Sequence, residues 1–158
     1  MASATVSRPM RIEEEIRQER FSDPLQKAVI NILFTSSWLS GEQNRTMKPF
    51  GISWQQFNIL RILRGQHPQA VCVADIKERM IDKMSNVSRL VEKLYQKNLV
   101  VRETSAHDRR MVDITITEAG LKLLGEVDVV MVQQRKSMLH LTDEELAQLN
   151  YLLDRLRG

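Results

Sequence analysis

The sequence predicts a mainly α-helical fold that carries one small β-hairpin. Apolar residues recur three and four positions apart over most of the 158 residues, which is the spacing of one helix face. After about residue 99 the period falls to two, because Val112, Ile114 and Ile116 alternate with polar residues. The four prolines all lie between the periodic segments. We therefore expect four helices, a two-stranded hairpin and two further helices, in that order.

A short helical run and the first of the four helices are predicted in the first third of the chain. The first is a short run over 12–20 that follows Pro9. The second begins at Asp23 and Pro24, an N-cap followed by proline at the first helical position, and runs to about Arg45. Its apolar stripe consists of Leu25, Val29, Ile32 and Leu39.

The middle of the chain predicts three more helices. Ser53 and Gln56 form a capping-box pattern that opens a helix with Phe57, Leu60 and Leu63 on its apolar face. A short helix over 74–80, a turn over 81–84 and a helix over 85–97 follow, and Asn98 is a suitable left-handed C-cap. The inward face of the last of these helices is expected to hold Val87, Leu90, Val91 and Leu94.

The hairpin and the last two helices complete the pattern. Residues 99–104 and 112–116 are predicted strands, and a polar loop over 105–110 joins them. Thr117 is expected to cap a helix that reaches about Lys136, and Thr142 opens the last helix with a second capping box. Two short helices joined by a turn and followed by a hairpin are the order of a winged helix-turn-helix. The last helix carries a stripe of Leu146, Leu149, Leu153 and Leu156.

The composition restricts the compartment and permits an acidic partner. A formal net charge of +3 is compatible with DNA binding without requiring it. The single cysteine, Cys72, excludes an internal disulfide and favours a reducing compartment. We expect a soluble cytoplasmic protein with no membrane association, because neither a signal-peptide pattern nor an apolar run of membrane-spanning length is present. Between Val71 and Val73, Cys72 is interpreted as a small buried hydrophobe, with a redox role as the alternative.

The motifs of common enzymes are missing from the sequence. His67, His107 and His140 are far apart, and no pair has the spacing of metal ligands. There is no glycine-rich phosphate loop and no nucleophile elbow. We therefore expect neither an enzyme nor a cofactor or metal. A catalytic site assembled only by the fold is the alternative, and no motif supports it.

The helix over 85–97 is the first candidate DNA-binding element. Ser85, Asn86, Ser88 and Arg89 lie at its expected exposed N-terminal end, and Lys93 adds positive charge one turn later. Asparagine pairs with adenine, arginine with guanine, and serine with either kind of base edge. Taken alone, the same pattern also fits an ordinary amphipathic helix with a polar outer face.

The hairpin tip is the second candidate element. Arg109 and Arg110 are expected to be exposed there, and a narrow minor groove attracts such side chains. Asp108 would be repelled by phosphate, so its expected role is to hold the loop or orient a neighbouring arginine. A solvated polar turn is the alternative interpretation of this loop.

Four segments together resemble the MarR family of bacterial transcription regulators. They are ISWQQF over 52–57, SNVSRLV over 85–91, KNLVVR over 97–102, and DRR over 108–110 followed by VDITIT over 112–117 and Gly120. The sequence departs from the family at Val73, where a capping Ser or Thr is common, and at Asn98, which replaces glycine. The segment before Pro24 is not a general feature of the family.

The resemblance implies a function and an organisation. It implies a single MarR-like domain over 1–158, with the winged helix-turn-helix over 52–117 and a helical dimerisation region over 10–46 and 118–158. The expected partners are a second copy of the chain, a pseudo-palindromic double-stranded operator, and a small apolar or aromatic acid that modulates a repressor. Arg110 matches the minor-groove arginine of the wing, and Asp108 the aspartate that supports it.

Two questions stay open on the sequence alone. Trp38 and Trp54 are interpreted as core residues, so the sequence predicts no ligand-binding residues. The alternative is that they line the pocket that the resemblance implies between the dimer and DNA-binding regions. The alternative functions are activation of transcription and use of the winged helix as a protein-interaction module. The Arg109–Arg110 wing and the polar helix end favour DNA.

Overall fold

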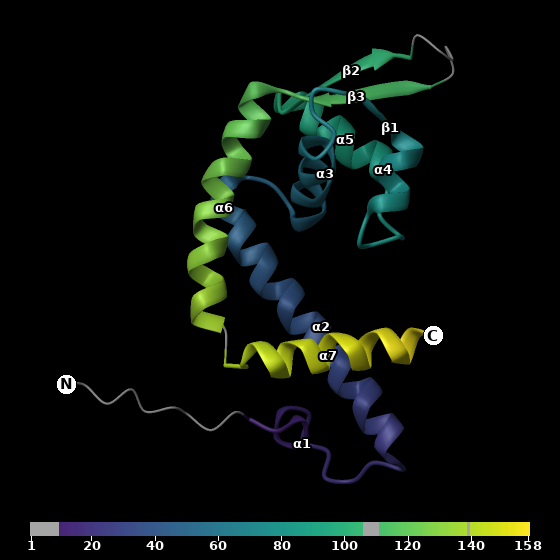
Figure 1. Cartoon of the computed structure of the whole chain (residues 1–158), viewed down its shortest axis with the longest axis vertical. Coiled ribbons are helices and arrows are strands. Elements are labelled where there is room, and N and C mark those ends of the chain that lie inside the picture. The colour runs from purple at the N-terminus through teal and green to yellow at the C-terminus, as the bar shows by residue number, and fades with distance from the viewer. Residues whose placement is uncertain (1–9, 106–110, 139) are drawn as a thin grey trace, which may run out of the picture. The chain divides into compact units, whose positions relative to one another are not determined.

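A computed structural model describes residues 10–105, 111–138 and 140–158 (Figure 1). For residues 135–138 it describes the backbone only. The chain divides into two compact units, Met1–Gln43 and Asn44–Gly158. Within the described residues, no helix is long and apolar enough to cross a membrane.

The first unit contains helix α1 (Ile12–Glu15) and most of helix α2 (Pro24–Met47). The expected helix over 12–20 is wrong in length, because Arg17 takes a left-handed backbone conformation with φ 51° and the helix cannot continue through it. The start predicted for α2 is confirmed: the Asp23 carboxylate accepts a hydrogen bond from the Gln26 N–H at 2.8 Å. Because this bond favours the ionised carboxylate, the pKa of Asp23 is lowered.

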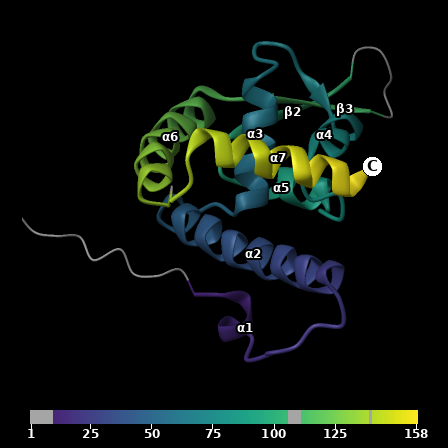
Figure 2. The same ribbon diagram turned by 60° about the horizontal axis from the view of Figure 1, so that its bottom comes forward.

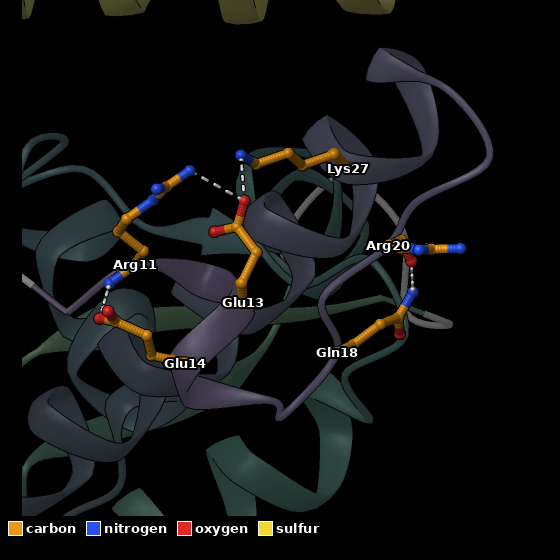
Figure 3. Close-up of polar contacts among 6 residues, drawn as sticks. All are labelled: Arg11, Glu13, Glu14, Gln18, Arg20 and Lys27. Atoms are coloured by element: carbon orange, nitrogen blue, oxygen red, sulfur yellow. Dashed lines mark hydrogen bonds and ion pairs between the residues drawn. The ribbon is translucent and has the colours of Figure 1, made fainter.

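One ion pair connects α1 to the first turn of α2, and a second lies at the start of α1 (Figure 3). Oε1 of Glu13 lies 2.6 Å from Nζ of Lys27 and 3.2 Å from a guanidinium nitrogen of Arg11. The Lys27 hydrogen bond, followed by the backbone of Glu13 itself, lowers the pKa of the Glu13 carboxyl. The neighbouring Ile12 is 6% exposed, so α1 is held by one buried apolar side chain and by the ion pairs of Glu13 with Arg11 and Lys27, which we call the N-terminal clasp.

The predicted apolar stripe of α2 is exposed in the single chain, whereas Met47 at the end of the helix is buried. Leu25 is 62% exposed and Val29 is 41% exposed, and Ile32 and Leu39 lie near the same level as Val29. Trp38 is 48% exposed, which corrects its interpretation as a core residue. The helix period was predicted correctly, but a periodic stripe does not reveal whether the same chain covers it.

The second unit has a three-stranded antiparallel sheet in the order β1-β3-β2. Its strands are β1 (Val71–Cys72), β2 (Val100–Thr104) and β3 (Val112–Ile116). The register pairs Val100 with Ile116 and Thr104 with Val112, which confirms the predicted hairpin. Strand β1 was not predicted, because two residues are too few to show an alternating period.

Helices α3 (Trp54–Arg64), α4 (Val73–Arg79) and α5 (Val87–Gln96) gather beside the sheet in both views (Figure 1, Figure 2). The short 3-10 helix η1 (Lys48–Phe50) precedes α3. Helix α3 is central, because it packs against α4, α5, α6 and β3. Its capping box is present as predicted, and Phe57, Leu60 and Leu63 are each no more than 1% exposed. Trp54 packs on this core, with its ring 5.1 Å from the Phe57 ring.

A tight junction connects the sheet to helix α6 (Glu118–Met138). Asn98 has φ 57°, the left-handed conformation predicted for it, and its carbonyl accepts a hydrogen bond from the Thr117 hydroxyl at 2.8 Å. The same hydroxyl oxygen accepts from the Gly120 N–H at 3.1 Å, which confirms Thr117 as the cap of α6. Farther along α6, Asp128 forms an ion pair at 2.6 Å with Arg64 of α3.

The last helix is α7 (Asp143–Arg157), and Thr142 opens it with the predicted capping box. The Glu145 N–H donates to the Thr142 hydroxyl at 3.3 Å, and the Glu145 carboxylate accepts from the Thr142 N–H at 2.8 Å. Leu149 and Leu156 are 43% and 52% exposed in the single chain. The second unit therefore also presents an uncovered apolar helix face.

Candidate nucleic-acid interface

The turn between α4 and α5 is fixed by a buried amide. Asn58 of α3 is 8% exposed, and its side-chain oxygen accepts a hydrogen bond from the Ile81 N–H at 3.0 Å. Because an unpaired buried amide is costly, this bond orients the turn relative to α3. The turn and its two flanking helices form the predicted helix-turn-helix. Sequence reasoning missed Asn58, whose only signal is a polar residue within an apolar helix.

Helix α4 begins one residue earlier than predicted, and its cap differs from the predicted one. The Cys72 sulfur accepts a hydrogen bond from the Asp75 N–H at 3.4 Å, and Val73 is the first helical residue. Val73 therefore does not replace a capping residue, because the N-cap of α4 lies one position earlier, at Cys72. The interpretation of Cys72 as a small buried hydrophobe is corrected: the residue is only partly buried, and its sulfur caps α4.

Asn86 is the N-cap of α5, so this helix starts two residues later than expected. The Asn86 side-chain oxygen accepts a hydrogen bond from the Arg89 N–H at 3.1 Å. Ser85 belongs to the turn, where its hydroxyl donates to the Asp82 carboxylate at 2.9 Å. Ser85 is consequently partly buried, whereas Asn86 is exposed.

The outer face of α5 is polar and basic. Ser88, Arg89 and Lys93 are exposed, and neither cation forms an ion pair among the described interactions. The opposite face holds Val87, Val91 and Leu94, each no more than 4% exposed, with Leu90 partly buried beside them. The predicted division of this helix into an apolar inner face and a polar outer face is confirmed.

One acidic residue also lies on α5, and its charge is paired. Glu92 forms an ion pair with Arg102 of β2, and the Arg102 guanidinium lies 5.8 Å from the centre of the Tyr95 ring. Lys97, which directly follows α5, donates a hydrogen bond to the Gly51 carbonyl. Arg89 and Lys93 are therefore the cations of α5 that remain available to an anionic partner.

The wing extends from the paired strands. The Ser105 N–H donates to the Met111 carbonyl at 3.0 Å, which continues the ladder one step beyond Thr104 and Val112. The residues predicted for the wing tip, Asp108, Arg109 and Arg110, lie outside the described residues. The structure supplies the register of the two strands up to Ser105 and Met111, at the opposite end of the hairpin from Ile116, which precedes α6.

The described part of the chain shows no other site of obvious chemistry. His67 and His140 are exposed, while His107 lies outside the described residues. Within the described residues, no group of three or more histidine, cysteine, aspartate or glutamate side chains has an arrangement that can hold a metal ion.

Comparison with known proteins agrees with this architecture. The MarR family model matches residues 52–112. The HTH-type transcriptional repressor MdtR of Bacillus subtilis (strain 168) is 31% identical over 120 residues, which cover 73% of this chain and 74% of that protein. The crystal structure of a MarR transcription factor from Planctomyces limnophilus is 30% identical, covers 85% of this chain and 98% of its own, and superposes with a TM-score of 0.66.

A helix-turn-helix beside a small sheet, with a basic face on its second helix, defines a winged-helix DNA-binding regulator. The chain belongs to the MarR family. It is a DNA-binding transcription regulator, and the family consists of regulators rather than enzymes. The S. aureus MepR–DNA complex shares the fold, with a TM-score of 0.71 at 22% identity over 79% of this chain and 92% of that one.

Proposed function

We propose that this protein is a homodimeric repressor that reads a pseudo-palindromic operator and is released from it by a small ligand. The observation that carries the proposal is the outer face of α5, where Arg89 and Lys93 are exposed beside Ser88 at a capped helix start. The resemblance to the B. subtilis repressor MdtR supports the sign of regulation.

The N-terminal part of α5 enters the major groove. Arg89 is suited to pair with guanine O6 and N7, and Ser88 to donate to or accept from a base edge. Lys93, one turn farther along the same face, is suited to a phosphate contact. Ser85 and Asn86 lie at the helix start, where free backbone N–H groups favour phosphate.

The wing enters the adjacent minor groove. Arg110 is the minor-groove contact, Arg109 is a phosphate contact beside it, and Asp108 orients the loop. This assignment rests on the position of the three residues in the sequence and on the family resemblance. In this arrangement, residues 52–117 form the DNA-binding region, and 10–46 with 118–158 form the dimerisation region.

A second copy of the chain covers the exposed apolar helix faces. Val29 and Leu39 on α2, and Leu149 and Leu156 on α7, each stay more than one third exposed in the single chain. Burying such residues stabilises the dimer by about 25 cal/mol for each Å² of apolar surface that is removed from water. Because a two-fold dimer presents two recognition helices, its half-sites are expected about one helical turn, roughly 10 base pairs, apart.

The ligand we propose is an apolar or aromatic acid, and it acts by population shift. The two copies of α5 in a dimer can lie at a spacing that fits the operator or at one that does not. A ligand shifts the protein between these two states only by the difference between its affinities for them. Linkage requires that a ligand which weakens DNA binding must itself bind more weakly to the DNA complex. Titration of the ligand into free protein and into the complex tests this. Equal affinity in both titrations contradicts the mechanism.

Selection of duplexes from a random library tests the DNA assignment. We expect a two-fold-related sequence, bound more weakly as salt rises because phosphate contacts release counterions. Arg89→Ala is expected to relax the selected sequence and cost about 1–3 kcal/mol on the parent site. Lys122→Ala removes an exposed cation from α6 instead and serves as the matched control, with affinity unchanged. Selection of no common sequence by the parent contradicts the proposed function.

A further inference from the structure

The turn before α5 presents a large apolar side chain to solvent. Met84 is 92% exposed, the highest value among the large apolar side chains of the described residues. Single exposed apolar residues are common, so exposure by itself indicates nothing. Two further features distinguish Met84: its backbone is held by hydrogen bonds, and it lies shortly before the start of α5.

The backbone around Met84 is fixed by Asp82. The Met84 N–H donates to one carboxylate oxygen of Asp82 at 3.0 Å. The next residue, Ser85, donates its hydroxyl to the other carboxylate oxygen at 2.9 Å and its N–H to the Asp82 carbonyl at 3.2 Å. The backbone of Met84 is therefore held two residues before Asn86, the N-cap of α5, so only the side chain has to be ordered when a contact forms.

The residues that follow Met84 are those suited to base edges. Asn86 is exposed, and Arg89 lies on the first turn of α5. On the major-groove edges of DNA, the one apolar group is the 5-methyl of thymine. Methionine is unbranched and polarizable, so its thioether adapts to a small apolar partner.

We propose that Met84 contacts a thymine methyl group at the edge of the half-site read by α5, and thereby makes the operator select thymine at that position. The inference rests on the proposed DNA-binding function and extends it to a residue that the basic and polar pattern does not include. A methyl group withdrawn from water corresponds to about fourfold in affinity.

Replacement of thymine by deoxyuridine isolates this contact, because it removes only the methyl group. Each thymine of one half-site in the selected operator is replaced in turn, and binding is measured by fluorescence anisotropy. With the parent protein, one replacement is expected to weaken binding about fourfold. With Met84→Ala, the same replacement is expected to have no effect, because the partner of the methyl group is gone.

Ile81→Ala provides a matched control from the same turn. Ile81 is 69% exposed but lies five residues before the N-cap of α5, and we expect this variant to keep the full deoxyuridine effect. Thermal unfolding of Met84→Ala is expected to match the parent, since the side chain is exposed.

The possible outcomes separate this inference from the proposed function. An equal deoxyuridine effect in the parent and in Met84→Ala overturns the inference, because another residue then reads the methyl group. So does the lack of an effect at every thymine, or a change of association state in Met84→Ala. If the parent selects no sequence, the proposed function fails, and the inference fails with it.

Discussion

Among the glycines of the described residues, Gly120 is the one at which an added methyl group would meet the closest atoms. It lies in the first turn of α6, directly after the strand that leads from the wing. A Cβ atom placed on Gly120 would lie 2.4 Å from the Leu99 carbonyl oxygen and 2.7 Å from Cγ1 of Ile116. The Leu99 carbonyl already accepts a hydrogen bond from the Thr117 N–H at 3.1 Å, so it is not free to move away.

The expected size of the effect follows from two opposing contributions. Relief of the overlap requires a shift of about 1 Å between backbone segments, and overpacking of this kind costs about 1–3 kcal/mol. Replacing glycine by alanine inside a helix stabilises by up to about 1 kcal/mol. Because the obstructing atom belongs to the backbone, we place the steric cost near its upper end. Gly120→Ala should then lower the free energy of unfolding by about 1–2 kcal/mol.

Gly125→Ala is the matched control, because it lies in the same helix and a Cβ there would have no neighbour within 4 Å. It should raise the free energy of unfolding by about 0.5–1 kcal/mol. Urea unfolding of both variants at one protein concentration, followed by circular dichroism, isolates the steric cost as the difference between them. If Gly120→Ala were as stable as Gly125→Ala, the close packing of α6 on the Leu99 carbonyl would be refuted.

Three further predictions concern the wing, the dimer and the N-terminal clasp. Arg110→Ala should weaken operator binding and remove a preference for A·T-rich flanks, as measured by anisotropy on matched duplexes. Val29→Asp should leave the helix content intact but give monomers at micromolar concentration by sedimentation, because a dimer would bury the new charge. The lowered pKa of Glu13 means that the clasp stabilises α1 above the ordinary glutamate pKa and is lost as pH falls through the lower folded value. The amide hydrogens of α1, measured by hydrogen exchange as protection relative to the unfolded chain at the same pH, should therefore become less protected below that pH in the parent and keep a protection independent of pH in Glu13→Gln; parent protection that is independent of pH contradicts this.

Local signals in the sequence predicted most helix ends, because each cap depends on a few adjacent residues. Ser53 and Thr142 open their helices as capping boxes, and Asn98 takes the left-handed conformation that its side chain tolerates. Where a prediction failed, competing local bonds decided the outcome. Asp82 engages Ser85 in a turn, which leaves Asn86 to cap α5.

Features that depend on distant parts of the chain were not predictable. Strand β1 exists because Val71 pairs with Ile114, more than forty positions away, and two residues carry no period of their own. The bond from Asn58 to Ile81 likewise joins segments that a local pattern treats separately. Exposure of Trp38 escaped prediction for a related reason: an apolar stripe is the same in sequence whether its own chain or a second copy covers it.

Because Asn86 caps α5, its side chain is restricted in the hydrogen bonds that it can form with a base. Pairing of asparagine with adenine uses the amide oxygen and the amide nitrogen together, but the Asn86 oxygen already accepts the Arg89 N–H at 3.1 Å. Turning the amide toward adenine would sacrifice a cap that stabilises a helix by about 1 kcal/mol, a sum comparable with the roughly 1–3 kcal/mol that a bidentate pair contributes. The amide nitrogen remains free to donate one hydrogen bond, which adenine N7, guanine N7 or O6, and thymine O4 all accept. Asn86 should therefore discriminate weakly among bases, and Arg89, whose guanidinium has no such competing duty among the described contacts, should carry most of the direct readout from α5.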